Sequence, residues 1–253
     1  LGEGGDDSLV SASAEGGAVS LDGGTGNDAI TATSANASII GGDGNDVITV
    51  TSAGVTGAQV NVLQGNAGND TVSSNAIGRD SLLGGQGDDS LVSNGGVVGD
   101  FINGNLGNDT LVGGGAGDTL LGEDGNDSLD GAAGSDTVTA GIGNDTVTGA
   151  AGNDNINAGD GNDSVDAGAD NDVVDMGVGD DTVTGNTGND SLTLGDGADS
   201  ALGDAGNDVI SGGAGTDTVD AGADTSVGRA VGDVAGGVGD GVGEVVEGVT
   251  DAA

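Results

Sequence analysis

The stretch that decides the fold, residues 122–148, reads GEDGNDSLD, GAAGSDTVT and AGIGNDTVT in three consecutive nine-residue units. Each unit has glycine at its fourth position, aspartate at its sixth and an aliphatic residue at its eighth. A short exact period of this kind is the sequence signature of a repeat architecture, in which each unit buries its apolar side chain only by stacking on its neighbours.

The period extends well beyond these three units. Residues 104–220 divide without a gap into thirteen units, and the eighth position is Leu, Ile or Val in all of them except at Ala201. The aspartates at the sixth position are Asp109, Asp118, Asp127, Asp136, Asp145, Asp154, Asp163, Asp172, Asp181, Asp190, Asp199, Asp208 and Asp217.

The same motif recurs more sparsely before residue 104, about once per two units. Its aspartates are Asp7, Asp28, Asp46, Asp70 and Asp89. Short apolar segments such as 37–40 and 80–83 lie between the motifs and lead into the next glycine-rich loop. We therefore expect one continuous coil, with regular loops on one edge and variable turns on the other in this half.

The residue types at each position have a physical reason. Glycine permits positive φ and lets the backbone pass close to an ion, and the short strand after it points its middle side chain inward. Two units make an 18-residue coil that buries about two aliphatic side chains, worth roughly 1.5 to 3 kcal/mol each. Backbone ordering costs roughly 1 to 2 kcal/mol per residue, so burial alone does not fold the coil, and the many carboxylates indicate a hard cation.

The units closely resemble the calcium-binding nonapeptide of RTX proteins, Gly-Gly-x-Gly-x-Asp-x-U-x. The resemblance implies an all-β, right-handed parallel β-roll (a β-solenoid) of about twelve coils, with Ca²⁺ between successive loops on each edge. Carried over to this chain, the ion between the loops at 122 and 140 is held by Gly122, Asp124 and Asn126 on one side and Gly141, Gly143 and Asp145 on the other. Twelve loops on one edge and six on the other give up to about 16 ions.

Every motif aspartate except Asp172 is a predicted ligand. Asp172 is left out because Asp170 replaces the glycine at the fourth position of its loop; Ala116 makes a similar departure, and Ala201 occupies a core position. The predicted organisation is a β-roll over 1–103 with calcium loops mainly on one edge, and a regular β-roll over 104–224 with calcium loops on both.

Residues 225–253 follow another pattern. Valines recur at helical spacing from Val227 to Val249, beside a stripe of glycines, which predicts a short amphipathic C-terminal helix. Its interior glycines lower helix propensity, and a basic residue near its start with acidic residues near its end opposes the helix dipole, so the helix is unstable alone. It serves as a cap on the last coil or as a subunit contact; a flexible tail or secretion signal is the remaining alternative.

Composition excludes several functions. The 253 residues carry 43 Asp plus Glu and 2 Lys plus Arg, a formal charge of −41, which excludes nucleic acid and anionic membranes as partners. With no His, Cys or Lys and no Gly-x-Ser-x-Gly, no catalytic constellation is visible, and we expect no enzyme activity. No apolar run is long enough to span a bilayer. Acidity with few aromatics suggests disorder, but the constant phase of the aspartates argues against it.

Two functions are consistent with these features. The first is a calcium-dependent extracellular structural protein, secreted to the cell surface, that folds on an array of Ca²⁺ and self-assembles into a filament, surface layer or matrix. The second is the C-terminal folding and export module of a longer type I secreted enzyme, toxin or adhesin; the motif at Leu1, which has no cap before it, motivates both. Pairs of outward-facing threonines such as Thr137 and Thr139 resemble the threonine arrays of ice-binding solenoids. In this chain the array is interrupted, so the general preference of threonine for β-strands explains it better.

Overall fold

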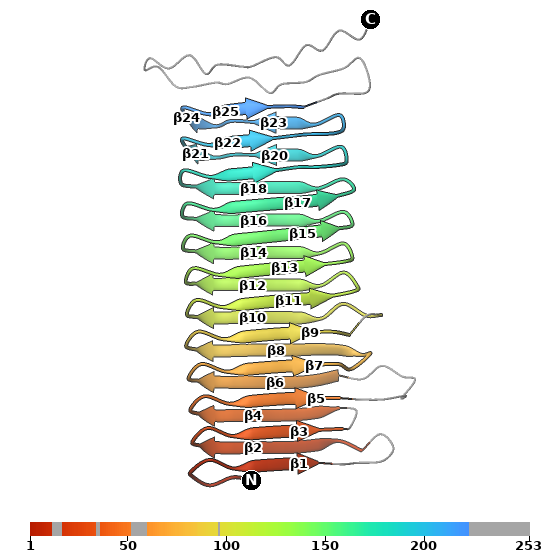
Figure 1. Cartoon of the computed structure of the whole chain (residues 1–253), viewed down its shortest axis with the longest axis vertical. Coiled ribbons are helices and arrows are strands. Elements are labelled where there is room, and N and C mark those ends of the chain that lie inside the picture. Colours follow the sequence, from red (N-terminus) through yellow and green to blue (C-terminus); the bar gives the residue numbers. More distant parts are fainter. Residues whose placement is uncertain (12–16, 34–35, 52–59, 96, 223–253) are drawn as a thin grey trace, which may run out of the picture.

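The computed structural model describes residues 1–11, 17–33, 36–51, 60–95 and 97–222. They form a parallel β-solenoid of about eleven turns, in which the chain alternates between two facing sheets and climbs one step at each turn (Figure 1). Every strand pairing is parallel. The all-β, β-roll prediction is confirmed, with about eleven turns where about twelve were expected.

Strand bounds follow the repeat closely. The first sheet contains β1 (Ser8–Ser11), β3 (Ala29–Ala32), β5 (Val47–Val50), β7 (Thr71–Ser74), β9 (Ser90–Ser93), β11 (Thr110–Gly114), β13 (Ser128–Ala132), β15 (Thr146–Ala151), β17 (Ser164–Ala169), β19 (Thr182–Thr184), β22 (Ser200–Leu202) and β25 (Thr218–Asp220). The second contains β2 (Val19–Thr25), β4 (Ala37–Asp43), β6 (Val60–Ala67), β8 (Arg79–Gln86), β10 (Phe101–Leu106), β12 (Thr119–Asp124), β14 (Thr137–Ile142), β16 (Asn155–Asp160), β18 (Val173–Val178), β20 (Ser191–Thr193), β21 (Asp196–Gly197), β23 (Val209–Ser211) and β24 (Ala214–Gly215).

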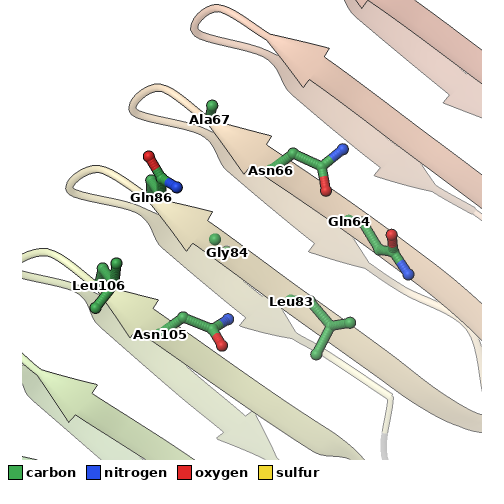
Figure 2. Close-up of a pocket in the computed structure, with 9 residues that line it drawn as sticks. Gln64, Asn66, Ala67, Leu83, Gly84, Gln86, Asn105 and Leu106 are labelled. Carbon is green, nitrogen blue, oxygen red and sulfur yellow. The ribbon is translucent and has the colours of Figure 1, made fainter.

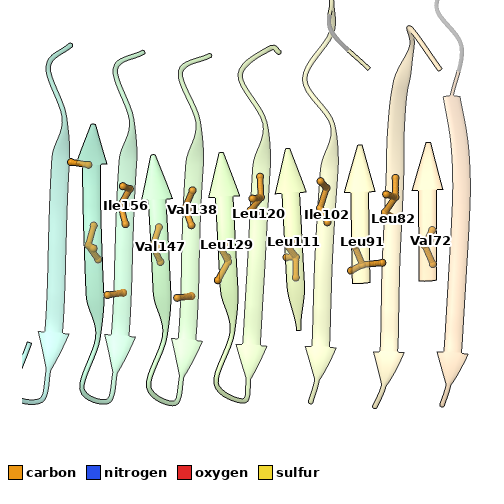
Figure 3. Packing of buried hydrophobic residues seen from close by; sticks show 14 of the residues in the cluster. Val72, Leu82, Leu91, Ile102, Leu111, Leu120, Leu129, Val138, Val147 and Ile156 are labelled. Carbon is orange, nitrogen blue, oxygen red and sulfur yellow. The ribbon is translucent and has the colours of Figure 1, made fainter. Parts of the chain in front are cut away.

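The core is two columns of aliphatic side chains, one from each sheet. The residue at the eighth position of each unit points inward and is buried, as Leu129 and Val138 are, while its neighbours along the strand face outward. The register sets Leu111 beside Leu129 and Val138 beside Ile156, so the same position repeats at every coil (Figure 3). Many strands bury a second, often small side chain two residues further on, as Ala140 follows Val138, and this narrow interior leaves no room for aromatic rings, which explains their near absence.

The loops require glycine where successive coils approach most closely. Gly125 and Gly143 lie at the fourth position of stacked loops, with φ of 145° and 142°. A Cβ on Gly143 would overlap the carbonyl of Gly125 in the preceding coil. The second position is left-handed too, and non-glycine residues such as Glu123 (φ 81°) and Ala150 (φ 75°) occupy it in some units.

Other predictions have different outcomes. The C-terminal helix over 225–253 lies outside the described residues. The sheets continue across residue 103, as expected for one continuous coil, since β8 pairs with β10 and β9 with β11, and the division into two regions of different loop pattern stays a prediction. Among the described residues, no helix has the length and apolar character needed to cross a membrane.

Replacing Gly143 with alanine tests the stacking. We expect Gly143→Ala to lower the free energy of unfolding by at least about 2 kcal/mol, because a side chain at this φ is strained and meets the backbone of the preceding coil. The matched change Ala150→Gly relieves a left-handed alanine and should stay within about 1 kcal/mol of the wild type. Urea unfolding in calcium buffer, followed by circular dichroism, measures both; equal effects of the two changes would contradict the stacking argument.

Candidate metal centre

The motif aspartates form two columns, one along each edge of the solenoid. Asp46, Asp127 and Asp145 lie on the first edge, where the chain passes from the second sheet to the first, and Asp118 and Asp136 lie on the opposite edge. From Asp28 to Asp199 the motif aspartates are at most 3% exposed, whereas Asp7 is half-buried. Buried carboxylates at this density are costly unless each oxygen has a partner.

One carboxylate oxygen of each aspartate has a backbone partner. The Asp127 N–H donates to Oδ1 of Asp145 at 2.7 Å, and the Asp145 N–H donates to Oδ1 of Asp163 at 2.8 Å. The same bond recurs along the first edge up to Asp217 and along the second edge up to Asp208. Each aspartate side chain therefore reaches back to the preceding coil and fixes the spacing of the loops.

Where asparagine precedes the motif aspartate, it makes a second ladder in the opposite direction. The Asn144 N–H donates to Oδ1 of Asn126 at 2.6 Å, and the Asn126 N–H donates to Oδ1 of Asn108 at 2.9 Å. These side chains are exposed and reach forward to the following coil. Adjacent residues thus clamp a loop to both of its neighbours, which explains why Asn-Asp recurs in the sequence.

The other carboxylate oxygen, Oδ2, is buried without a hydrogen-bond partner at nearly every level of both columns. The residues with this unpartnered oxygen are Asp28, Asp46, Asp70, Asp89, Asp109, Asp118, Asp127, Asp136, Asp145, Asp154, Asp163, Asp172, Asp181, Asp190, Asp199 and Asp217. A buried ionised oxygen with no donor is compensated by a cation or by protonation. The repetition at each level indicates a row of cation sites.

The donor set around these oxygens suits a hard cation. Beside Gly122, the space that a Cβ would fill is bounded by Oδ2 of Asp127 and the carbonyl oxygen of Ala140. No three acidic, His or Cys side chains converge in the described part of the chain, and backbone carbonyl oxygens lie beside the buried carboxylate. All-oxygen coordination of this kind is preferred by Ca²⁺.

The six ligands predicted between the loops at 122 and 140 lie on adjacent coils. Gly122 and Asp145 are buried, and Gly141 and Gly143 stack against the carbonyls of Glu123 and Gly125. The Asp124 side chain is exposed, and its backbone oxygen accepts a hydrogen bond from the Gly107 N–H at 2.9 Å. Asn126 donates and accepts within the asparagine ladder.

Sequence reasoning passed over three aspartates that belong to the columns. Asp172, set aside for its altered loop, accepts from the Asp154 N–H at 2.8 Å and has the same unpartnered Oδ2, because Asp170 adopts the left-handed φ of 82° itself. Asp80 and Asp100 extend the second column toward the N-terminus. Both lie two residues before a buried aliphatic side chain, as in the Asp-x-U part of the motif. This spacing was the sequence feature from which they could have been identified.

Burial raises the pKa of these carboxyls. Desolvation raises the pKa of Asp136 from 3.8 to about 7; the carboxylates of Asp154 and Asp118 raise it further, against the opposing effect of the Asp118 N–H. Desolvation likewise raises the pKa of Asp172 to about 7 and those of Asp127 and Asp163 to about 6. Without a cation, the columns therefore favour protons.

A surface hollow of about 490 Å³ lies apart from this chemistry, over β6, β8 and β10 (Figure 2). Amide side chains such as Gln64, Asn66 and Asn105 line it together with Leu83 and Leu106. Its lining residues include no carboxylate, so it does not compete with the columns for cations.

The raised pKa values set a pH dependence in the absence of metal. Since the folded columns bind protons that the unfolded chain releases near pH 4, stability in chelator is greatest at about pH 4 and is lost as pH rises through about 6 to 7. We expect β-structure by circular dichroism at pH 4.5 but not at pH 8 in chelator, with calcium restoring it at pH 8. A chelated protein that folds better at pH 8 than at pH 4.5 would contradict this.

Comparison with known proteins agrees with the geometry. The family profile of the RTX calcium-binding nonapeptide repeat matches residues 22–50, 55–76, 77–97, 103–138, 112–147, 139–174, 148–183, 175–200 and 193–227. No curated protein matches the chain. Repeats of this kind are typically structural and typically occur in secreted bacterial proteins. With its two columns of buried aspartates and matches covering most of its length, the chain belongs to the RTX calcium-binding nonapeptide repeat family.

Proposed function

We propose that this chain is a calcium-dependent extracellular structural protein that folds on an array of Ca²⁺ and self-associates. The observation that carries the calcium part is the unpartnered Oδ2 of the motif aspartates, repeated at one coil after another on both edges. An ordered chain of this composition needs a positive charge at each of these oxygens. The predicted motif aspartates are therefore the proposed ligands, now with Asp172 among them.

The charge of the chain supports the same mechanism. The formal charge is −41, and about 16 divalent ions would supply about +32. Because the loops stack only in the folded state, calcium binds the folded chain and stabilises it by mass action. The chain is then unfolded at low intracellular calcium and folds at the higher concentration outside the cell.

Calcium titration tests this mechanism. At pH 7.5 we expect little β-structure in chelator and a cooperative gain of β-structure with added Ca²⁺, reversed by chelator, measured by circular dichroism. Asp145→Asn should bind about one ion fewer by equilibrium dialysis, because the amide still accepts from Asp127 but lacks the charge of Oδ2.

Asp175→Asn is the matched control for the Asp145 variant. Asp175 is exposed on the outer face of β18, so removing its charge should leave the ion count unchanged. β-structure that persists after complete chelation at pH 7.5, or equal ion counts for the two variants, would refute calcium-dependent folding at the columns.

Self-association is proposed from an exposed stripe on the first edge. The third position of successive loops alternates between apolar and acidic residues, and the apolar members Leu106, Ile142 and Val178 are 48%, 59% and 52% exposed. Asp124 and Asp160 stand between them. The apolar side chains recur every two coils, about 10 Å apart, a spacing that a second copy of the same stripe can match by lying alongside.

Sedimentation velocity in calcium buffer measures this contact. We expect wild-type protein to associate with rising concentration, and Ile142→Asp with Val178→Asp to shift it toward monomer by about tenfold or more in dissociation constant, because the carboxylates would repel across the contact. Val173→Asp is the control: it is 52% exposed but lies on the sheet face of β18. Equal loss of association in the control, or none in the double variant, would exclude this stripe as the interface.

A further inference from the structure

The second edge differs in its N-terminal part from the rest of the solenoid. The backbone ladder continues beyond Asp118: the Asp100 N–H donates to Asp118 Oδ1 at 2.7 Å, and the Asp80 N–H donates to Asp100 Oδ1 at 2.6 Å. At the next level the side chain is Asn61, whose Nδ2 donates to Asp80 Oδ1 at 2.6 Å. Asn61 accepts in turn from the Ala37 N–H at 2.8 Å. The column therefore keeps its geometry where the nonapeptide is absent.

At these levels the second carboxylate oxygen has a hydroxyl partner. The Ser93 hydroxyl donates to Oδ2 of Asp100 at 2.5 Å, and the Ser74 hydroxyl donates to Oδ2 of Asp80. Both serines are fully buried, at 0% exposure. The oxygen that is unpartnered at Asp118 and Asp136 is thus satisfied at Asp80 and Asp100 by the protein itself.

The serines occupy the place of a loop glycine. Val92 pairs with Val112, so Ser93 lies level with Gly113, the first residue of a regular unit, and Ser74 pairs with Ser93. In the regular units this place faces Oδ2 of the aspartate, as Gly113 faces Asp118. A single Gly-to-Ser difference therefore puts a neutral donor where the regular loop leaves the oxygen open.

The charges at this end of the column also disfavour a bound cation. Asn61 is neutral where the ladder elsewhere has a carboxylate. Arg79, one of only two basic residues in the sequence, directly precedes Asp80, in the place that asparagine holds in the regular loops. Ca²⁺ at this level would have to compete with a serine hydroxyl for the second carboxylate oxygen.

We infer that the loops ending at Asp80 and Asp100 take no calcium, and that hydrogen bonds from Ser74 and Ser93 replace the ions there. The inference deepens the proposed function, since it limits the ion row on the second edge to the levels from Asp118 onward. In a solenoid each coil is stabilised by its neighbours. The coils at Asp80 and Asp100, which are ordered without ions, give the calcium-dependent coils a surface on which to stack as the calcium concentration rises.

Hydrogen exchange on the full chain tests this inference. In chelator at pH 7.5, we expect the Asp80 and Asp100 amides to be protected while those of Asp127 and Asp145 exchange freely, and calcium to protect the latter pair. The double variant Ser74→Ala with Ser93→Ala should speed exchange at Asp80 and Asp100 in chelator by about tenfold or more, because each Oδ2 loses its donor.

Ser90→Ala is the matched control, since Ser90 lies on the same strand as Ser93 but faces outward. Equilibrium dialysis should give the same ion count for wild type, the double alanine variant and the control. The inference would be overturned if the Asp80 amide became protected only on adding calcium, at the same calcium concentration as the Asp127 amide. A lower ion count in the double serine variant would also overturn it. If calcium protects no amide anywhere, the proposed calcium-dependent folding fails. The exchange rates of the serine variants in chelator then still show whether the Ser74 and Ser93 hydroxyls stabilise this edge.

Discussion

The structure depends on a buried carboxylate that recurs from coil to coil and whose two oxygens have different hydrogen-bond environments. Oδ1 accepts a backbone N–H from the preceding coil and so sets the rise and register of the loops. Oδ2 faces the interior of the loop edge and is left without a donor. A thin core of one or two aliphatic side chains per strand cannot offset that cost, so the fold is conditional on whatever neutralises the second oxygen.

Protons and calcium compete for that role, and this competition gives the high negative charge its function. Burial raises the pKa of the column carboxyls, to about 7 at Asp89 and Asp136, so in the absence of metal the folded chain favours acid. A divalent ion removes the same penalty at neutral pH. Asp80 and Asp100 show a third solution, a serine hydroxyl, and desolvation raises the pKa of Asp100 to about 6 despite it.

Much of the fold and of the candidate site could be predicted because the motif acts locally. The phase of Asp127 and Leu129 is enough to place a loop edge and an inward side chain, since a strand alternates its faces and a loop glycine allows the turn. Asp172 was left out of the predicted ligands because its loop lacks the fourth glycine, yet Asp170 adopts the left-handed conformation there and Asp172 keeps its place in the column. Asp80 and Asp100 were missed because their loops keep only part of the glycine pattern, Gly78 before Asp80 and Gly95 before Asp100, and the inter-coil hydrogen bonds place them in the column.

The nine-residue period by itself determined the solenoid, the inward aliphatic column and the position of one carboxylate per loop, because these follow from neighbours along the chain. The tertiary structure decided which oxygen of each carboxylate is satisfied, because the N–H that reaches Oδ1 of residues such as Asp145 and Asp118 comes from a residue 18 positions earlier, in the preceding coil. It also decided that Ser74 and Ser93 point at Asp80 and Asp100 while Ser90 faces outward. The conformation of each loop sets the direction of these hydroxyls, whereas the stacking of coils supplies the backbone N–H for the first oxygen.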